Sequence, residues 1–175
     1  MKSERNGIMK KIICALLCAI LLICAVSCKA PAQNEEDDAD RFYFGGISMI
    51  LPEGFSVTEA AGMKMAIYKD YPVHSDNITF SEGDGNISAY SEEALKQEIG
   101  SVLGELKDFK SEQKKVGDCD LVIASFGVEY LGVEMKETIY AYFIGAGSVA
   151  ITFVSVSGEF DTAFEQTAAS IKIVG

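Results

Sequence analysis

The chain has few side chains of the kinds that carry out catalysis. Its only histidine is His74, and one of its five cysteines, Cys119, lies outside the N-terminal apolar segment. Cys119 stands between Asp118 and Asp120, and neighbouring carboxylates disfavour the reactive thiolate form of a cysteine. We therefore expect a strand cysteine that points into the core. His74 follows Pro72 in a polar segment typical of a surface loop, and the spacing yields no serine–histidine–acid set. We predict no catalytic residue.

Two groups of oxygen-bearing side chains are candidates for cation binding. Asp118 and Asp120 would share one face of a regular strand, and Glu82, Asp84 and Asn86 lie together in SEGDGN. Neither group matches the twelve-residue calcium loop, with its fixed glycine and terminal glutamate. Turns favour Asp, Asn and Gly for backbone reasons alone, so we interpret both segments as solvated turns and keep a cation site as the alternative. The single histidine and the cysteine spacing argue against zinc, and we expect no metal or other cofactor.

Three tyrosines form the candidate binding surface. Tyr130, Tyr140 and Tyr142 lie in segments that alternate in the manner of strands. Tyrosine is common at protein interfaces because its ring is broad and half-polar. The alternative is core packing under a helix, which the alternation favours.

Cys28 lies where an apolar segment meets an acidic one. The segment before it has a basic start, at Met1 or Met9, and ends in small residues up to Ser27, as in a secretory signal. The stretch AVSC resembles the lipobox of bacterial lipoproteins, although alanine stands where leucine is commonest. The resemblance implies removal of residues 1–27 and a diacylglyceryl thioether on Cys28, with acyl chains of the palmitate type. Two such chains give a stable anchor, and the alternative is an uncleaved transmembrane helix.

Residues 28–40 read as a disordered acidic tether, because they contain five acids and no aromatic or branched aliphatic side chain. From Cys28 onward the chain has 11 basic and 25 acidic residues, against a net charge of -11 for the whole sequence. A surface this acidic repels nucleic acids and anionic headgroups, so neither is an expected electrostatic partner. The sequence predicts a protein lipid-anchored on the extracytoplasmic side of the cell membrane.

Residues 41–175 are predicted to form one α+β domain. Ser91 is a helix N-cap candidate, and Leu95, Ile99 and the apolar residues that follow up to Leu106 draw one stripe along a helix. A last helix is expected over about 159–170. The remaining patterns alternate with a period of two and predict an antiparallel sheet flanked by these helices. The expected strands lie in the segments 42–51, 55–59, 63–70, 77–82, 111–132 (two strands), 134–144 and 149–157, with loops at 81–86 and 145–148.

The order of these elements resembles the PsbP/Mog1/DcrB-like superfamily. The residues that carry the resemblance are LPEGF (51–55), the hairpin YAYFIGAGSVAITFVSVS (140–157), and Phe160 with Phe164 before Ile171. The resemblance covers most of the domain and implies an α/β/α sandwich with a central antiparallel sheet. Members of this superfamily include photosystem subunits, small-GTPase partners and envelope proteins, and many bacterial members look like exported lipoproteins. Their common property is binding or assembly rather than catalysis.

The expected function is therefore that of a membrane-anchored, non-catalytic module that binds or assembles proteins, with a partner of unknown identity. The first alternative is a lipoprotein that binds a small ligand or a cation in a cleft between sheet and helix. The second is a hydrolase, which would need a pocket lined by His74 and two carboxylates.

Overall fold

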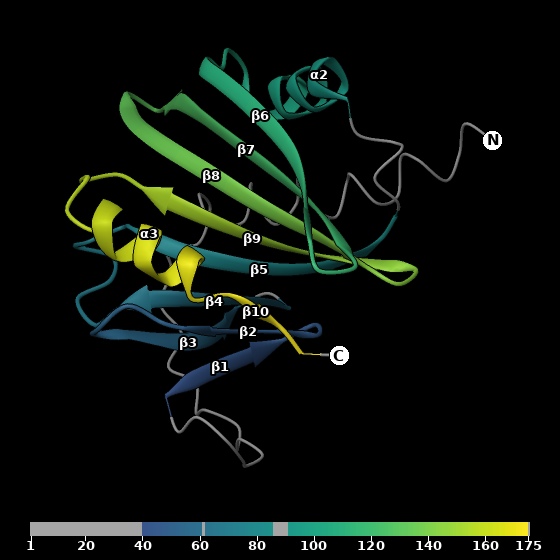
Figure 1. Ribbon diagram of the computed structural model, residues 1–175. Helices are drawn as coiled ribbons and strands as arrows, with labels where there is room; N and C mark the ends of the chain where they lie inside the picture. The colour runs from purple at the N-terminus through teal and green to yellow at the C-terminus, as the bar shows by residue number, and fades with distance from the viewer. Residues whose placement is uncertain (1–39, 61, 86–90, 175) are drawn as a thin grey trace.

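Two antiparallel β-sheets form the framework of the domain (Figure 1). A computed structural model describes residues 40–60, 62–85 and 91–174. The larger sheet has the strand order β3-β4-β5-β9-β8-β7-β6, and the smaller one has the order β1-β2-β10. The elements are β1 (Arg41–Phe44), β2 (Ile47–Ile50), β3 (Phe55–Ala60), β4 (Met63–Tyr68), β5 (Asn77–Asp84), α2 (Glu92–Leu103), β6 (Lys107–Val116), β7 (Cys119–Tyr130), β8 (Val133–Ile144), β9 (Gly147–Ser155), α3 (Asp161–Ala169) and β10 (Lys172–Ile173).

Strand β8 separates two hydrophobic cores, as its sequence predicts. Ile139, Ala141 and Phe143 face one core, whereas Tyr140 and Tyr142 face the other. Successive side chains of a strand point to opposite faces, so the continuous apolar run from Ile139 to Ile144 needs cover on both faces. The predicted burial of both faces of this strand is confirmed.

Helix α2 covers the first core, over β6, β7 and β8. Its N-terminus is capped as predicted, because the Ser91 hydroxyl accepts a hydrogen bond of 3.2 Å from the backbone N–H of Ala94. Leu95 and Ile99 are buried against the sheet. The helix ends earlier than predicted, since Gly104 adopts a φ of 89°, outside the helical region.

The second core is covered by α3 together with the smaller sheet, as Figure 1 shows. Ile47 and Met49 of β2 are fully buried there, beside Phe164 of α3. The predicted α/β/α sandwich is therefore wrong in one layer, which is largely a second sheet. The reason is that β1 and β2 turn back on each other at a two-glycine turn, and β2 then pairs with the C-terminal strand β10 instead of joining the main sheet.

Several other element bounds differ from the predictions. The loop predicted at 81–86 is strand as far as Asp84, because these residues pair with the start of β9. The loop predicted at 145–148 shrinks to two residues, since β9 begins at Gly147. The last helix begins at Asp161 rather than near Glu159.

The predicted signal segment, Cys28 and the tether up to residue 39 lie outside the described residues, as does Asn86. Neither of the two described helices is long and apolar enough to cross a membrane. The predicted boundaries at 1–27, 28–40 and 41–175 stay predictions.

Candidate functional site

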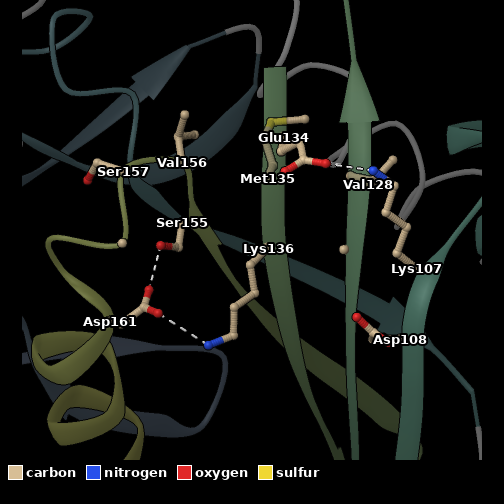
Figure 2. A pocket seen from close by; sticks show the side chains of 12 residues that line it. Lys107, Asp108, Val128, Glu134, Met135, Lys136, Ser155, Val156, Ser157 and Asp161 are labelled. Carbon is tan, nitrogen blue, oxygen red and sulfur yellow. Dashed lines mark hydrogen bonds and ion pairs between the residues drawn. The ribbon is translucent and has the colours of Figure 1, made fainter. Parts of the chain in front are cut away.

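A hollow of about 320 Å³ opens at one end of the larger sheet. It is lined by the beginnings of β6, β8 and α3 and by the ends of β7 and β9, which the antiparallel order brings to the same edge. Figure 2 shows its charged side chains, which come from β6, β8 and α3. Segments far apart in sequence therefore contribute to one surface.

One side of the hollow is organised around Asp161, the first residue of α3. Its carboxylate accepts a hydrogen bond of 2.5 Å from the Ser155 hydroxyl and lies 3.3 Å from the Lys136 ammonium (Figure 2). The Ser155 hydrogen bond, with Lys136 beside it, lowers the pKa of Asp161. The carboxylate is thus held in its charged form at the N-terminal end of a helix, where negative charge is favourable.

The other side of the hollow is organised around Lys107. Its ammonium lies 2.6 Å from a Glu134 carboxylate oxygen and 3.6 Å from one of Glu129. The hydrogen bond to Glu134 raises the pKa of Lys107 and lowers that of Glu134. The pair is exposed to solvent, so it contributes little to the stability of the fold.

The backbone at this end of the sheet is strained in two places. Asp108, in the bulge of β6 between Lys107 and Lys110, has a φ of 51°. Leu131, in the turn between β7 and β8, has the same φ. These two are the non-glycine residues with positive φ in the described part of the chain. Aspartate tolerates this conformation, but leucine adopts it rarely.

Asp76 holds the connection from β9 to α3 that lines the hollow. It is fully buried and accepts hydrogen bonds from the backbone N–H groups of Val156 and Ser157 and from the Ser157 hydroxyl, at 3.0 to 3.3 Å. Asp76 was not among the site residues predicted from the sequence. Its partners are about 80 positions away, and only its place directly before a strand could have drawn attention to it.

His74 lies in the loop that precedes β5, as predicted. Its Nδ1 is 3.5 Å from the Glu159 carboxylate, and its ring meets those of Tyr68 and Phe160 edge to face. These contacts place the imidazole against aromatic rings and one exposed acid. His74 is not among the residues that line the hollow.

The residues around Cys119 lie at the opposite end of β7 from the hollow. Cys119 is half-buried at the first position of the strand. Asp118 precedes the strand, so it does not share a regular strand with Asp120, and Asp120 lies 2.8 Å from Lys115. Residues 40–60, 62–85 and 91–174 contain no group of three His, Cys, Asp or Glu side chains placed to hold a metal, around Glu82 and Asp84 or elsewhere.

The three candidate tyrosines do not form one surface. Tyr142 is only 4% exposed, and its burial raises the pKa of its phenol to about 12. Tyr140 packs edge to face on Phe153 in the same core. Tyr130 points to the other face of the sheet, at the end of β7 next to Leu131.

Glu137 is a buried carboxyl group that was likewise not among the site residues predicted from the sequence. Its side chain is 1% exposed, and its Oε2 atom has no hydrogen-bond partner among the described residues. Val154 lies directly opposite both Glu137 and Asn77, and the Oδ1 atom of Asn77 likewise lacks a described partner. Burial raises the pKa of Glu137 to about 8, so the carboxyl is largely protonated at neutral pH. In the sequence, the position of Glu137 in alternation with the inward-facing apolar residues of β8 was the pattern that indicated a buried side chain.

Comparisons with known proteins show similarity of fold. No protein-family model matches the chain, and no curated protein does. The solution structure of PsbP (CyanoP) from Synechocystis is similar over 82% of this chain and 98% of that one, with a TM-score of 0.59 and 10% identity. LpqN from Mycobacterium tuberculosis, described as involved in cell envelope biogenesis, is similar over 74% and 83%, with a TM-score of 0.51 and 14% identity.

A third structure, from Bacteroides thetaiotaomicron, is 19% identical over 77% of this chain, with a TM-score of 0.49. The match spans 48%, or about half, of the length of that protein. The PsbP part of the expected resemblance is confirmed at the level of the fold. This chain has a PsbP-like fold built on a large antiparallel sheet.

Proposed function

We propose that this protein is a membrane-anchored, extracytoplasmic module that binds or assembles other proteins and performs no catalysis itself. The observation that carries the proposal is the change at Cys28 from an uncharged apolar run to an acidic segment, ahead of a folded domain. The anchor would be a diacylglyceryl group on Cys28, and residues 28–40 would hold the domain away from the bilayer.

The fold and the charged hollow support the non-catalytic part of the proposal. One protein of similar fold is PsbP, and another is involved in cell envelope biogenesis. Two of the three acids that line the hollow are engaged, Asp161 by Ser155 and Lys136, and Glu134 by Lys107. Side chains fixed in this way define the shape and charge of a surface.

A substitution at the anchor tests the localisation. We expect Cys28→Ser to move the protein out of the membrane fraction or to leave it with its leader uncleaved. Cys24→Ser is the matched control, because Cys24 lies in the same apolar run after the bulky Ile23 and should leave the protein in the membrane. Equal behaviour of the two variants would refute the role of Cys28.

Purification of the tagged full chain from native membranes tests the binding role. We expect at least one protein to co-purify reproducibly with the wild-type chain. If repeated purifications under gentle detergent yield no such protein, the binding role is refuted.

A second candidate function is the binding of a small polar ligand in the hollow. The volume of about 320 Å³ favours it, since it lies at the lower end of the range for small-molecule sites. A ligand would raise the melting temperature through the term RT ln(1 + [L]/Kd). We expect Asp161→Asn to abolish any such rise, and a screen of calcium and metabolites without a thermal shift would exclude this function.

A further inference from the structure

The turn between β7 and β8 exposes apolar side chains at the end of the larger sheet. Leu131 is 88% exposed and Val133 is 47% exposed. Figure 1 shows this turn at the outer end of two long strands, at the upper left of the molecule. Single exposed apolar residues are ordinary, so exposure alone does not mark an interface.

The conformation of Leu131 sets it apart. Leu131 and Gly132 form the two-residue turn, with φ values of 51° and 80°. A turn with positive φ at both central positions favours Asn-Gly, and leucine is strained there. Leu131 therefore adds nothing to the packing of the core, from which it points away, and its strained backbone does not stabilise the turn. A residue that the fold does not require points to a contact outside the fold.

The end of the hairpin that β7 and β8 form is also held in place. Glu129 and Glu134 lie directly opposite each other on β7 and β8, where two like charges repel. The Lys107 ammonium of β6 lies 3.6 Å from the first carboxylate and 2.6 Å from the second, so it offsets part of this repulsion. Backbone pairing of β7 with β8 continues up to Tyr130 and Val133 and holds the hairpin together. A surface held before binding loses less conformational entropy when a partner arrives.

We propose that this hairpin tip, defined as Glu129–Glu134 with Leu131 at its apex, docks into a protein partner whose surface offers an apolar pocket rimmed by lysine or arginine. The inference rests on the proposed binding function and names its surface. Glu129 and Glu134 are each more than half exposed on either side of the apex. The two carboxylates outnumber the one ammonium of Lys107 between them, and the net negative charge complements a basic rim and disfavours insertion into a bilayer of anionic lipids.

Thermal unfolding of the full chain gives the first test, with three variants. We expect Leu131→Asn to raise the melting temperature by about 3 °C, because asparagine accepts the left-handed conformation. Leu131→Met keeps both the apolar side chain and the strain, so it should leave the melting temperature unchanged. Val73→Asn is the matched control, because Val73 is 84% exposed at the same end of the sheet, without positive φ.

Binding gives the second test. A photoreactive benzoylphenylalanine replaces Leu131, or Val73 as the control, in the full chain in cells of the native host. The protein crosslinked through position 131 is identified and purified, and its Kd is measured with each variant. We expect Leu131→Asn to weaken binding about thirtyfold, the loss that corresponds to one buried leucine. Leu131→Met and Val73→Asn should bind within threefold of wild type, and salt should weaken binding.

Several results would overturn the inference. They are crosslinks from position 131 to lipid alone, crosslinks only to a second copy of this chain, no crosslink, and a Kd that Leu131→Asn leaves unchanged. If proteins co-purify with the chain but none is reached from position 131, this inference fails while the binding function stands. If no protein co-purifies, the proposed function itself has failed.

Discussion

Replacing Glu137 by glutamine should change how the stability of the protein depends on pH. The carboxyl is buried, and burial raises its pKa from the ordinary 4.5 to about 8. In the unfolded chain the same carboxyl is exposed and loses its proton near pH 4.5. Between these two values the folded state therefore holds a proton that the unfolded state has released.

The sign and size of the effect follow from this difference. Because the folded state binds more protons, the free energy of unfolding falls as the pH rises. The contribution of the protonated Glu137 carboxyl to the free energy of unfolding is fully present below pH 4.5. It declines by about 1.4 kcal/mol per pH unit above that value and is lost above the folded pKa of about 8. Between pH 5 and pH 8 the loss from Glu137 amounts to about 3 to 4 kcal/mol.

Urea unfolding of the full chain at several pH values measures this loss. Circular dichroism is a suitable signal, because the chain has no tryptophan. We expect the Glu137→Gln variant to gain about 3 to 4 kcal/mol relative to wild type between pH 5 and pH 8, since glutamine does not titrate. The comparison cancels the titration of all other groups. Glu53→Gln is the control, because Glu53 is exposed in a turn and should follow wild type. If the free energy of unfolding depends on pH in the same way for wild type and Glu137→Gln, the conclusion that the Glu137 carboxyl is buried and protonated is refuted.

Two further substitutions test the contacts that shape the domain. Asp76→Ala should destabilise the protein by about 2 to 4 kcal/mol, because it leaves the N–H groups of Val156 and Ser157 without their acceptor. Chemical denaturation measures the loss, and Asp70→Ala, in the exposed part of the same loop, should cost less than about 0.5 kcal/mol. Equal losses for the two aspartates would contradict the role of Asp76. Ser91→Ala should cost about 1 kcal/mol through loss of the helix cap, and an unchanged urea midpoint would contradict the cap.

The alternation of apolar and polar residues predicted much of the larger sheet. Strand β8 is apolar on both faces from Ile139 to Ile144, which implied cover on both faces, and the structure places a core on each. The N-terminus of α2 was predictable because Ser91 and the acids after it form a local capping signal. The alternation within a strand and the capping pattern of a helix involve residues that are close in sequence, which is why they could be predicted.

The remainder depends on contacts between distant segments. Residues 41–50 carry the alternation of a strand pair, but the pattern does not say that their partner is β10, more than 120 positions later. At the hollow, Lys107 pairs with Glu134 and Lys136 pairs with Asp161. The residues of each pair lie on different elements, so the local sequence gives no indication that they meet. Asp76 is recognised only from its burial and its hydrogen bonds to distant residues. Glu137 is recognised only from its burial and from an Oε2 atom without a partner among the described residues.

The mass of the N-terminal peptide from the protein purified from its native membrane tests the central claim most directly. We expect a peptide that begins at Cys28 and carries the added mass of a diacylglyceryl group. An unmodified peptide that still includes residues 1–27, on a protein recovered from the soluble fraction, would contradict the membrane-anchored module proposed here.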